Sequence, residues 1–130
     1  MTPRSEAWIR QAESDLAAAQ LTAAQGFHAQ ACYLADQAAE KALKGLLVAA
    51  GITPPYSHSL DKLVELLQEQ GIALPALAAL QLKALTRMNS ASRYPQGDAA
   101  PADLFDGNDS QSALATATAV LSAASEHLQP

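Results

Sequence analysis

Apolar and small residues recur every three to four positions through most of this chain, a spacing that places them on one side of an α-helix. A first helix is predicted to begin at "TPRSE", because Thr2 is a capping residue and Pro3 suits the first helical position. Gly26 is expected to end it. Its predicted inner face consists of Ile9, Ala12, Leu16, Ala19 and Ala23.

The most regular segment covers about residues 27–50, where a continuous stripe of small residues ends before Gly51. Small side chains let a neighbouring helix approach closely, so we expect this segment to be the central helix of a bundle. The stripe consists of Ala31, Ala35, Ala38, Ala42, Leu46 and Ala49.

Three further helices follow. Pro54 and Pro55 form a turn in which Ser57 is expected to cap a third helix, which carries Leu60, Leu63, Val64 and Leu67 and ends at Gly71. A fourth helix is predicted after Pro75, with Leu77, Leu80, Ala84, Leu85 and Met88 on its inner face. It should end near Tyr94, because the residue before Pro95 is disfavoured in a helix. A fifth helix is predicted from Asn108 or Asp109, with Leu114, Ala117, Leu121, Ala124 and Leu128 inside.

Residues 95–109 have no helical periodicity, and a structureless connection of that length in a compact domain is either functional or mobile. The predicted fold is a single all-α domain over residues 1–130, an antiparallel up-down bundle of four long helices plus a shorter helix.

Composition limits the possible partners. Hydrophobic residues make up 49% and charged residues 16%, with a net charge of −5, so a nucleic acid could be contacted only at a local site. The lone Cys32 cannot form an internal disulfide and is expected to be an inert, small apolar residue. The apolar runs are too short to span a membrane, and the N-terminus lacks the apolar core of a signal peptide. We therefore expect a cytoplasmic protein without membrane contact.

The chemistry-bearing residues gather on the second helix, opposite the alanine stripe. Tyr33, Gln37, Glu40 and Lys44 share one side, flanked by Asp36 and Lys41. Two interpretations remain open. This side is either a solvated face with a Glu40–Lys44 ion pair, or a polar groove wall that Arg93 reaches from another helix.

No metal or cofactor is expected, because His28, His58 and His127 have no ligand spacing and no phosphate-binding glycine loop or catalytic triad motif is present. His58 is expected to bond local backbone at the start of the third helix. Asp15 would ordinarily be solvated, and its burial would require a cationic partner.

Four stretches of the sequence together resemble the HEPN domain ("higher eukaryotes and prokaryotes nucleotide-binding") over about residues 5–128. They are "WIRQAESDLAAA", "ACYLADQAAEKALKGLLVAAGI", "HSLDKLVELL" and "SRYP". The resemblance implies a helical bundle that pairs as a homodimer, with polar residues near a cleft between protomers. It also implies one of several functions: a ribonuclease, a nucleotide-binding module, or the toxin of a toxin–antitoxin pair whose partner is a minimal nucleotidyltransferase. The matching positions are Asp15, Glu40, Lys41, Lys44, His58, Arg93, Tyr94 and Pro95.

The sequence departs from the ribonuclease members in one respect. Those members are similar in carrying an arginine followed, after four to six residues, by a histidine that can transfer a proton. Counted from Arg87 the histidine position holds Ser92, Arg93 or Tyr94, and counted from Arg93 it holds Asp98, Ala99 or Ala100. Only a folded-back His58 could substitute.

Three functions follow from these observations. The leading hypothesis is that Arg93 binds a nucleotide or RNA phosphate, that Tyr94 stacks on a base, and that the loop 95–109 covers the groove. The alternative is a non-catalytic dimerisation or interaction module in which Arg93 pairs with Glu40 or Asp15. The third is a metal-independent ribonuclease that uses Arg93 and His58.

Overall fold

The structure, a computed structural model, describes residues 2–129 of the chain. Within these residues there is no β-strand, only an isolated bridge between Gln96 and Ala99. The all-α bundle predicted from the sequence is confirmed. Its helices are α1 (Pro3–Ala24), α2 (His28–Ala49), α3 (Leu60–Glu69), the 3₁₀ helix η1 (Pro75–Leu77), α4 (Leu82–Ala91), α5 (Pro101–Leu104) and α6 (Gly107–Leu128).

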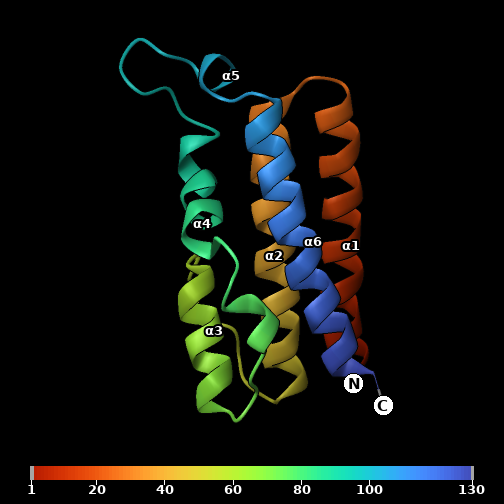
Figure 1. Cartoon of the computed structure of the whole chain (residues 1–130). Helices are drawn as coiled ribbons and strands as arrows, with labels where there is room; N and C mark the ends of the chain where they lie inside the picture. The colour runs from red at the N-terminus through yellow and green to blue at the C-terminus, as the bar shows by residue number, and fades with distance from the viewer. Residues whose placement is uncertain (1, 130) are drawn as a thin grey trace.

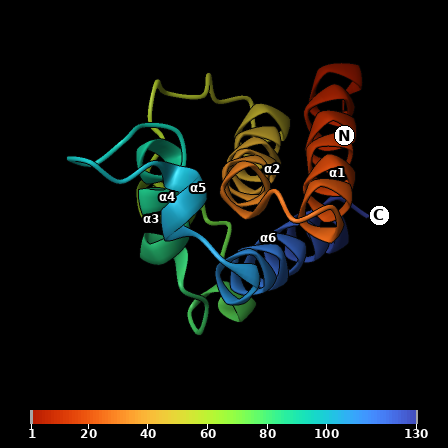
Figure 2. The same ribbon diagram turned by 90° about the horizontal axis from the view of Figure 1, so that it is seen from above.

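The bundle has four columns, of which α1, α2 and α6 each form one (Figure 1). The fourth column is made of α3 and α4, stacked end to end. From α1 to α2, and from α4 to α6, the chain reverses its direction (Figure 1). Seen from above, α2 lies in the middle, and it contacts α1, α3, α4, α5 and α6 (Figure 2). The segment predicted to be the central helix therefore is central.

Small residues explain how closely α1 and α2 pack. Ala35, Ala38 and Ala42 on α2 are fully buried. At Gly45 an added Cβ would lie 3.1 Å from the Cβ of Trp8 and 3.2 Å from Cδ1 of Ile9, which is tighter than ordinary van der Waals contact. The glycine therefore permits the two helices to approach at this point.

The fourth column has a joint at its middle, where α3 and α4 both begin. The Leu60 main-chain N–H donates to Oγ1 of Thr86 at 3.1 Å, and Lys83 lies 3.9 Å from Asp61. Because both helices begin here, they run away from the joint in opposite directions (Figure 1).

The sequence predicted the first, second and fifth helices to within two residues, but the fourth helix was wrong in extent. A single helix was expected from Leu77 to near Tyr94, whereas η1 ends at Leu77 and α4 covers only Leu82–Ala91. Leu77 and Leu82 are both buried. The apolar spacing that suggested one continuous helix is thus produced by two separate helices, η1 and α4.

Two smaller predictions also need correction. Ser59, not Ser57, caps α3, since its Oγ accepts from the Lys62 N–H while Ser57 Oγ accepts from the Ser59 N–H. The segment 95–109 is not structureless, because it contains α5 and a turn closed by Gln96 and Ala99. This segment lies over the upper end of the bundle (Figures 1 and 2) rather than along the α2–α4 face.

Among the residues the structure describes, no helix combines the length and the apolar character needed to cross a bilayer.

Candidate functional site

The polar side of α2 is buried rather than solvated. Asp36 is fully buried, and Glu40 and Lys44 are only 5% and 8% exposed. These residues lie beneath the fourth column, because α3 and α4 both pack on α2. Charged side chains are rarely buried without partners, so each of them raises the question of what balances its charge.

Glu40 has two basic partners. Lys44 Nζ donates to its Oε2 at 3.0 Å, and Nδ1 of His58 lies 2.8 Å from its Oε1. The imidazole is mostly exposed, with 64% of its side-chain surface accessible. His58 therefore does not bond local backbone as the sequence suggested, but is held by a buried carboxylate of α2.

Arg93 lies between two aromatic rings in the turn that follows α4. Its guanidinium carbon is 4.7 Å from the centre of the Tyr33 ring and 5.0 Å from the centre of the Tyr94 ring. Both distances are within the range of cation–π attraction. The arginine also donates from Nε to the main-chain oxygen of Asn89 at 2.6 Å and from Nη2 to its Oδ1 at 2.9 Å.

Asp36 lies one turn before Glu40 on α2 and bonds the residue that holds Arg93. Its Oδ2 accepts from Nδ2 of Asn89 at 3.3 Å, whereas its buried Oδ1 has no hydrogen-bond partner among residues 2–129. Burial raises the pKa of Asp36 from 3.8 to about 7, with Glu40 adding to the rise and the Asn89 bond opposing it. We call the continuous set the α2–α4 polar strip: Tyr33, Asp36, Glu40, Lys44, His58, Asn89, Arg93 and Tyr94.

Two of the residues singled out from the sequence lie outside this strip. Lys41 forms an ion pair with Asp15, which also accepts from Nε2 of Gln11 at 2.9 Å. Asp15 is 8% exposed, so the cationic partner required for its burial is Lys41. This pair ties α1 to α2.

One interpretation of the sequence required a contact between Arg93 and Glu40 or Asp15, and the structure does not contain it. Within residues 2–129 Arg93 forms no ion pair, because those carboxylates are already paired with lysine and histidine. Its internal partner is Asn89. The sequence pattern did not single out this residue, although its i, i+4 spacing to Arg93 on a helix was a signal that could have found it.

Ser92 stands at one of the positions where ribonuclease relatives have histidine, and it does not project into the strip. It is 5% exposed, and its hydroxyl donates to the main-chain oxygen of Met88 on its own helix. Ser92 therefore does not take the place of that histidine in the strip.

Neither metal nor thiol chemistry finds support in the described part of the chain. No three side chains of His, Cys, Asp or Glu there lie close enough to hold a metal ion. Burial, together with Asp109 and Asp106, raises the pKa of the Cys32 thiol to about 12. Cys32 is fully buried, as expected of an inert apolar residue.

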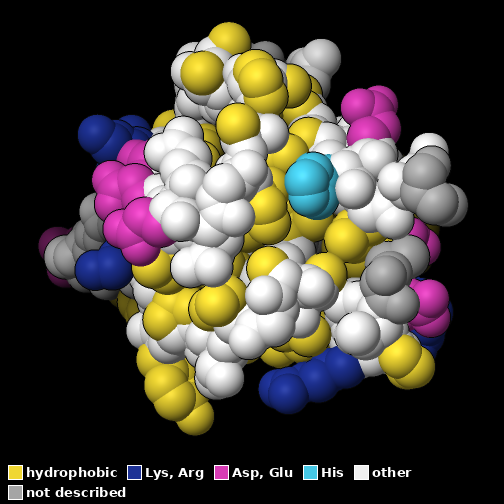
Figure 3. Space-filling view, turned by 90° about the horizontal axis from the view of Figure 1, so that it is seen from below, with side chains coloured by type: hydrophobic (Ala, Val, Ile, Leu, Met, Phe, Trp, Pro, Cys, Tyr) yellow, Lys and Arg dark blue, Asp and Glu magenta, His cyan; other side chains and the backbone are white. Residues whose placement is uncertain are grey.

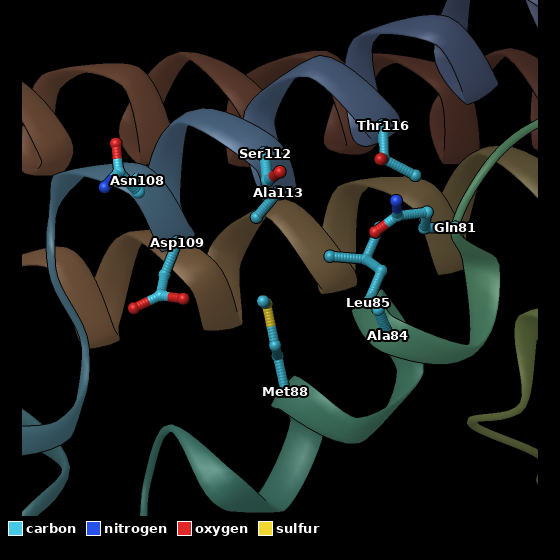
Figure 4. A pocket seen from close by; sticks show the side chains of 9 residues that line it. All are labelled: Gln81, Ala84, Leu85, Met88, Asn108, Asp109, Ser112, Ala113 and Thr116. Atoms are coloured by element: carbon cyan, nitrogen blue, oxygen red, sulfur yellow. The ribbon is translucent and has the colours of Figure 1, made fainter.

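Hollows in the surface lie away from the strip, and two of them adjoin α6. One, of about 290 Å³, runs between α4 and α6, and Figure 4 shows Met88 and Leu85 facing Ala113, with Asp109 and Gln81 beside them. The other lies at the lower end of the bundle, where Figure 3 shows apolar side chains around a histidine. It is lined by Leu46, Ala49, Ala50, Ile72, His127 and Leu128. Neither hollow is lined by a residue of the α2–α4 polar strip.

Two features together define a class of small helical domain. One is the four-column helical bundle, and the other is the buried polar strip on its central helix, which Arg93 and Tyr94 complete just before Pro95. The comparison with known families gives the same answer, because the HEPN domain matches residues 5–128. This chain belongs to the HEPN domain family.

Two solved structures resemble the whole fold. The protein TT1696 from Thermus thermophilus is 33% identical with a TM-score of 0.87, over 98% of this chain and all of that one. ST0689, described as an archaeal HEPN homologue, is 27% identical with a TM-score of 0.73, over 98% of this chain and all of its own. No protein of curated function matches this sequence.

Proposed function

We propose that this HEPN protein binds the phosphate groups of a nucleotide or RNA at Arg93. The observation that carries the proposal is that Arg93 is an exposed guanidinium held between two aromatic rings and without a carboxylate partner in residues 2–129. A fixed cation that the protein itself does not neutralise is suited to bind an external anion.

The hydrogen-bond geometry of Arg93 leaves room for that anion. A guanidinium has five N–H groups, and Asn89 accepts from only two of them, one on Nε and one on Nη2. The three remaining donors are both N–H groups of Nη1 and the second N–H of Nη2. One N–H of each of these two nitrogens points the same way, and such a parallel pair matches two oxygens of a phosphate.

The surrounding charges do not compete for Arg93. Glu40 forms an ion pair with Lys44 and a hydrogen bond with His58. Burial raises the pKa of Asp36 to about 7, which lessens its negative charge near neutral pH. An approaching phosphate would therefore meet a cation on Arg93 with little opposing negative charge. Tyr94, with 57% of its surface exposed, offers a ring on which a base could stack.

The proposal is tested by fluorescence anisotropy with a fluorescein-labelled oligoadenylate, with AMP as competitor. We expect Arg93→Ala to weaken binding at least about tenfold, the equivalent of about 1.4 kcal/mol, with little change in Tm because the side chain is exposed. Arg10→Ala is the matched control, since Arg10 is an exposed arginine of α1. Equal binding by the wild type and Arg93→Ala would contradict the proposal. Absence of binding by the wild type would favour the interaction module.

The bond between His58 and Glu40 favours RNA cleavage as a second candidate function. A carboxylate that accepts from Nδ1–H leaves Nε2 of the imidazole as a base directed elsewhere. Nδ1 of His58 lies 2.8 Å from Glu40, and the ring is exposed. Arg93 would stabilise the charge that develops on the phosphorus oxygens in the transition state.

Cleavage is tested by incubating labelled RNA with the purified protein in EDTA. We expect products from the wild type and their loss in both His58→Ala and Arg93→Ala. His127→Ala is the matched control, because His127 is a second exposed histidine, on α6. RNA left intact by the wild type would exclude this candidate while leaving phosphate binding open.

On family membership alone, we also propose that the chain forms a homodimer and that its partner is a minimal nucleotidyltransferase. Light scattering coupled to size-exclusion chromatography tests the first. Co-purification with a nucleotidyltransferase encoded by the neighbouring reading frame tests the second. A monomeric mass at micromolar concentration would contradict the homodimer.

A further inference from the structure

Asn89 bonds Arg93 with both its main chain and its side chain. Arg93 Nε donates to the Asn89 main-chain oxygen at 2.6 Å, and Nη2 donates to Oδ1 at 2.9 Å. The first bond depends on the backbone of α4 alone. The second depends on the side-chain amide being turned with its oxygen, not its nitrogen, toward the guanidinium. A flipped amide would place N–H groups against N–H groups.

Asp36 determines which way this amide is turned. Nδ2 of Asn89 donates to Oδ2 of Asp36 at 3.3 Å. Whether ionised or neutral, a carboxyl group keeps an oxygen that can accept there, so the amide nitrogen is held toward α2 and the amide oxygen toward Arg93. Asp36 is fully buried and lies on the central helix, so packing restricts the position of its carboxyl group and hence that of the amide.

We propose that Asp36 and Asn89 are positioning residues for the phosphate-binding site, acting in series to fix the guanidinium of Arg93 in the gap between the Tyr33 and Tyr94 rings. This inference rests on the proposed function, which it deepens. Neither residue would contact the phosphate. Their role is to hold the free edge of the guanidinium in one orientation, so that less side-chain freedom is lost when an anion binds.

A different role for the pair would be a simple tie between α2 and α4. The two roles differ in what they predict for Arg93. A tie affects only how firmly α4 is held, whereas positioning residues change the rotation of the guanidinium and the affinity for phosphate in a protein that remains folded. Binding and motion are therefore both needed as measurements.

The variants follow from the chemistry of each position. Asn89→Ala removes the amide, while alanine is a good helix former. Asp36→Leu removes the oxygen that orients the amide. Asp36→Asn keeps an acceptor for Nδ2 of Asn89 and is the conservative variant. Asn108→Ala is the matched control, because Asn108 is an exposed asparagine at the start of α6.

Two properties are measured for the wild type and all variants, at a temperature below the Tm of the least stable variant. The first is anisotropy with labelled oligoadenylate. We expect Asn89→Ala and Asp36→Leu to weaken binding about fivefold to tenfold, or about 1–1.4 kcal/mol. Asp36→Asn should bind more tightly than Asp36→Leu, and Asn108→Ala should match the wild type. In an Arg93→Ala background, Asn89→Ala should cause no further loss.

The second readout does not depend on binding. Hindered rotation of the Arg93 guanidinium, followed by ¹⁵N NMR, should become faster in Asn89→Ala and Asp36→Leu but not in Asn108→Ala. Unchanged rotation in Asn89→Ala would overturn the proposal. So would unchanged affinity in Asn89→Ala when Arg93→Ala binds poorly.

If the wild type binds neither oligoadenylate nor AMP, the proposed function fails, and with it the role of the pair in phosphate binding. The NMR comparison would then still decide whether Asp36 and Asn89 hold Arg93 in place. Failure of the proposed function and failure of the positioning pair are thus distinguishable.

Discussion

The guanidinium carbon of Arg93 lies 4.7 Å from the centre of the Tyr33 ring, which joins the end of α4 to the first third of α2. Tyr94 covers the guanidinium from another side, at 5.0 Å. Aromatic rings attract a cation without forming hydrogen bonds to its N–H groups, which remain available to other partners. This relationship gives Arg93 a fixed place without neutralising its charge.

Removing the Tyr33 ring should therefore weaken phosphate binding through Arg93. We expect Tyr33→Leu to lower the affinity for labelled oligoadenylate about twofold to fivefold, since a cation–π contact at an exposed site contributes about 0.5–1 kcal/mol. Tyr33→Phe keeps the ring and should bind like the wild type. If Tyr33→Phe binds as weakly as Tyr33→Leu, the hydroxyl and not the ring is responsible.

Asp36 should make stability depend on pH in an unusual direction. Its pKa rises from 3.8 in the unfolded chain to about 7 in the folded protein. Below 3.8 both states are protonated and no penalty arises. Between these values the unfolded chain releases the proton and the folded protein keeps it. The contribution of Asp36 to the free energy of unfolding then falls by about 1.4 kcal/mol for each pH unit, and above about 7 it stays constant.

Asp36→Asn removes this titration while retaining the shape and an acceptor. We expect its stability relative to the wild type to increase as the pH rises from about 4 to 7, measured by urea unfolding at several pH values. Other groups titrate in both proteins and largely cancel in the difference. A difference that does not vary with pH would show that Asp36 ionises normally.

Glu40 should be the polar residue whose loss is most damaging to stability. Its side chain is 7% exposed and balances Lys44, whose side chain is 10% exposed. Glu40→Gln leaves a buried ammonium group without a counter-charge, so we expect a loss of about 3 kcal/mol in the free energy of unfolding. The double variant Glu40→Gln/Lys44→Met should recover part of that loss. Urea unfolding that matches the wild type for Glu40→Gln would contradict this account.

Gly45 should not tolerate a side chain. A Cβ there would lie 3.1 Å from the Cβ of Trp8, an atom close to the backbone of α1, so the helices would have to separate. We expect Gly45→Ala to cost about 1 kcal/mol and Gly45→Leu about 3 kcal/mol of stability, by thermal unfolding.

The control for this prediction is Gly107→Ala at the start of α6, where an added Cβ would be 3.7 Å from Cε1 of His28. That distance is ordinary contact, so we expect no loss. A more stable Gly45→Ala would mean that α1 yields easily and that the gain in helix propensity outweighs the crowding.

The bundle was predictable because the signals that start and stop its long helices are strong. Thr2 caps α1, and the small-residue stripe of α2 continues until just before Gly51. The break between η1 and α4 was not predictable from spacing, since Leu77 and Leu82 are buried whether one helix or two contain them. Apolar periodicity reports which residues face the core, not whether the backbone between them is continuous.

The site was predictable only in part. The polar side of α2 was identified from its residues, but two interpretations stayed open because spacing on one helix does not show what packs against it. Burial of Asp36 and Glu40 beneath α3 and α4 excludes the solvated face, although the Glu40–Lys44 ion pair is present, and Arg93 does not reach Glu40. The partner of Arg93 was missed, because a neutral amide such as Asn89 gives no charge signal in the sequence.

His58 lies at the joint of the fourth column, just before α3, whereas Arg93 follows the far end of α4. The two exposed groups of the polar strip are therefore separated by the length of α4. A helical turn added to or removed from α4 would change the distance between imidazole and guanidinium, and with it the size of an anion that both could contact. The packing of α1, α2 and α6 on one another would not need to change.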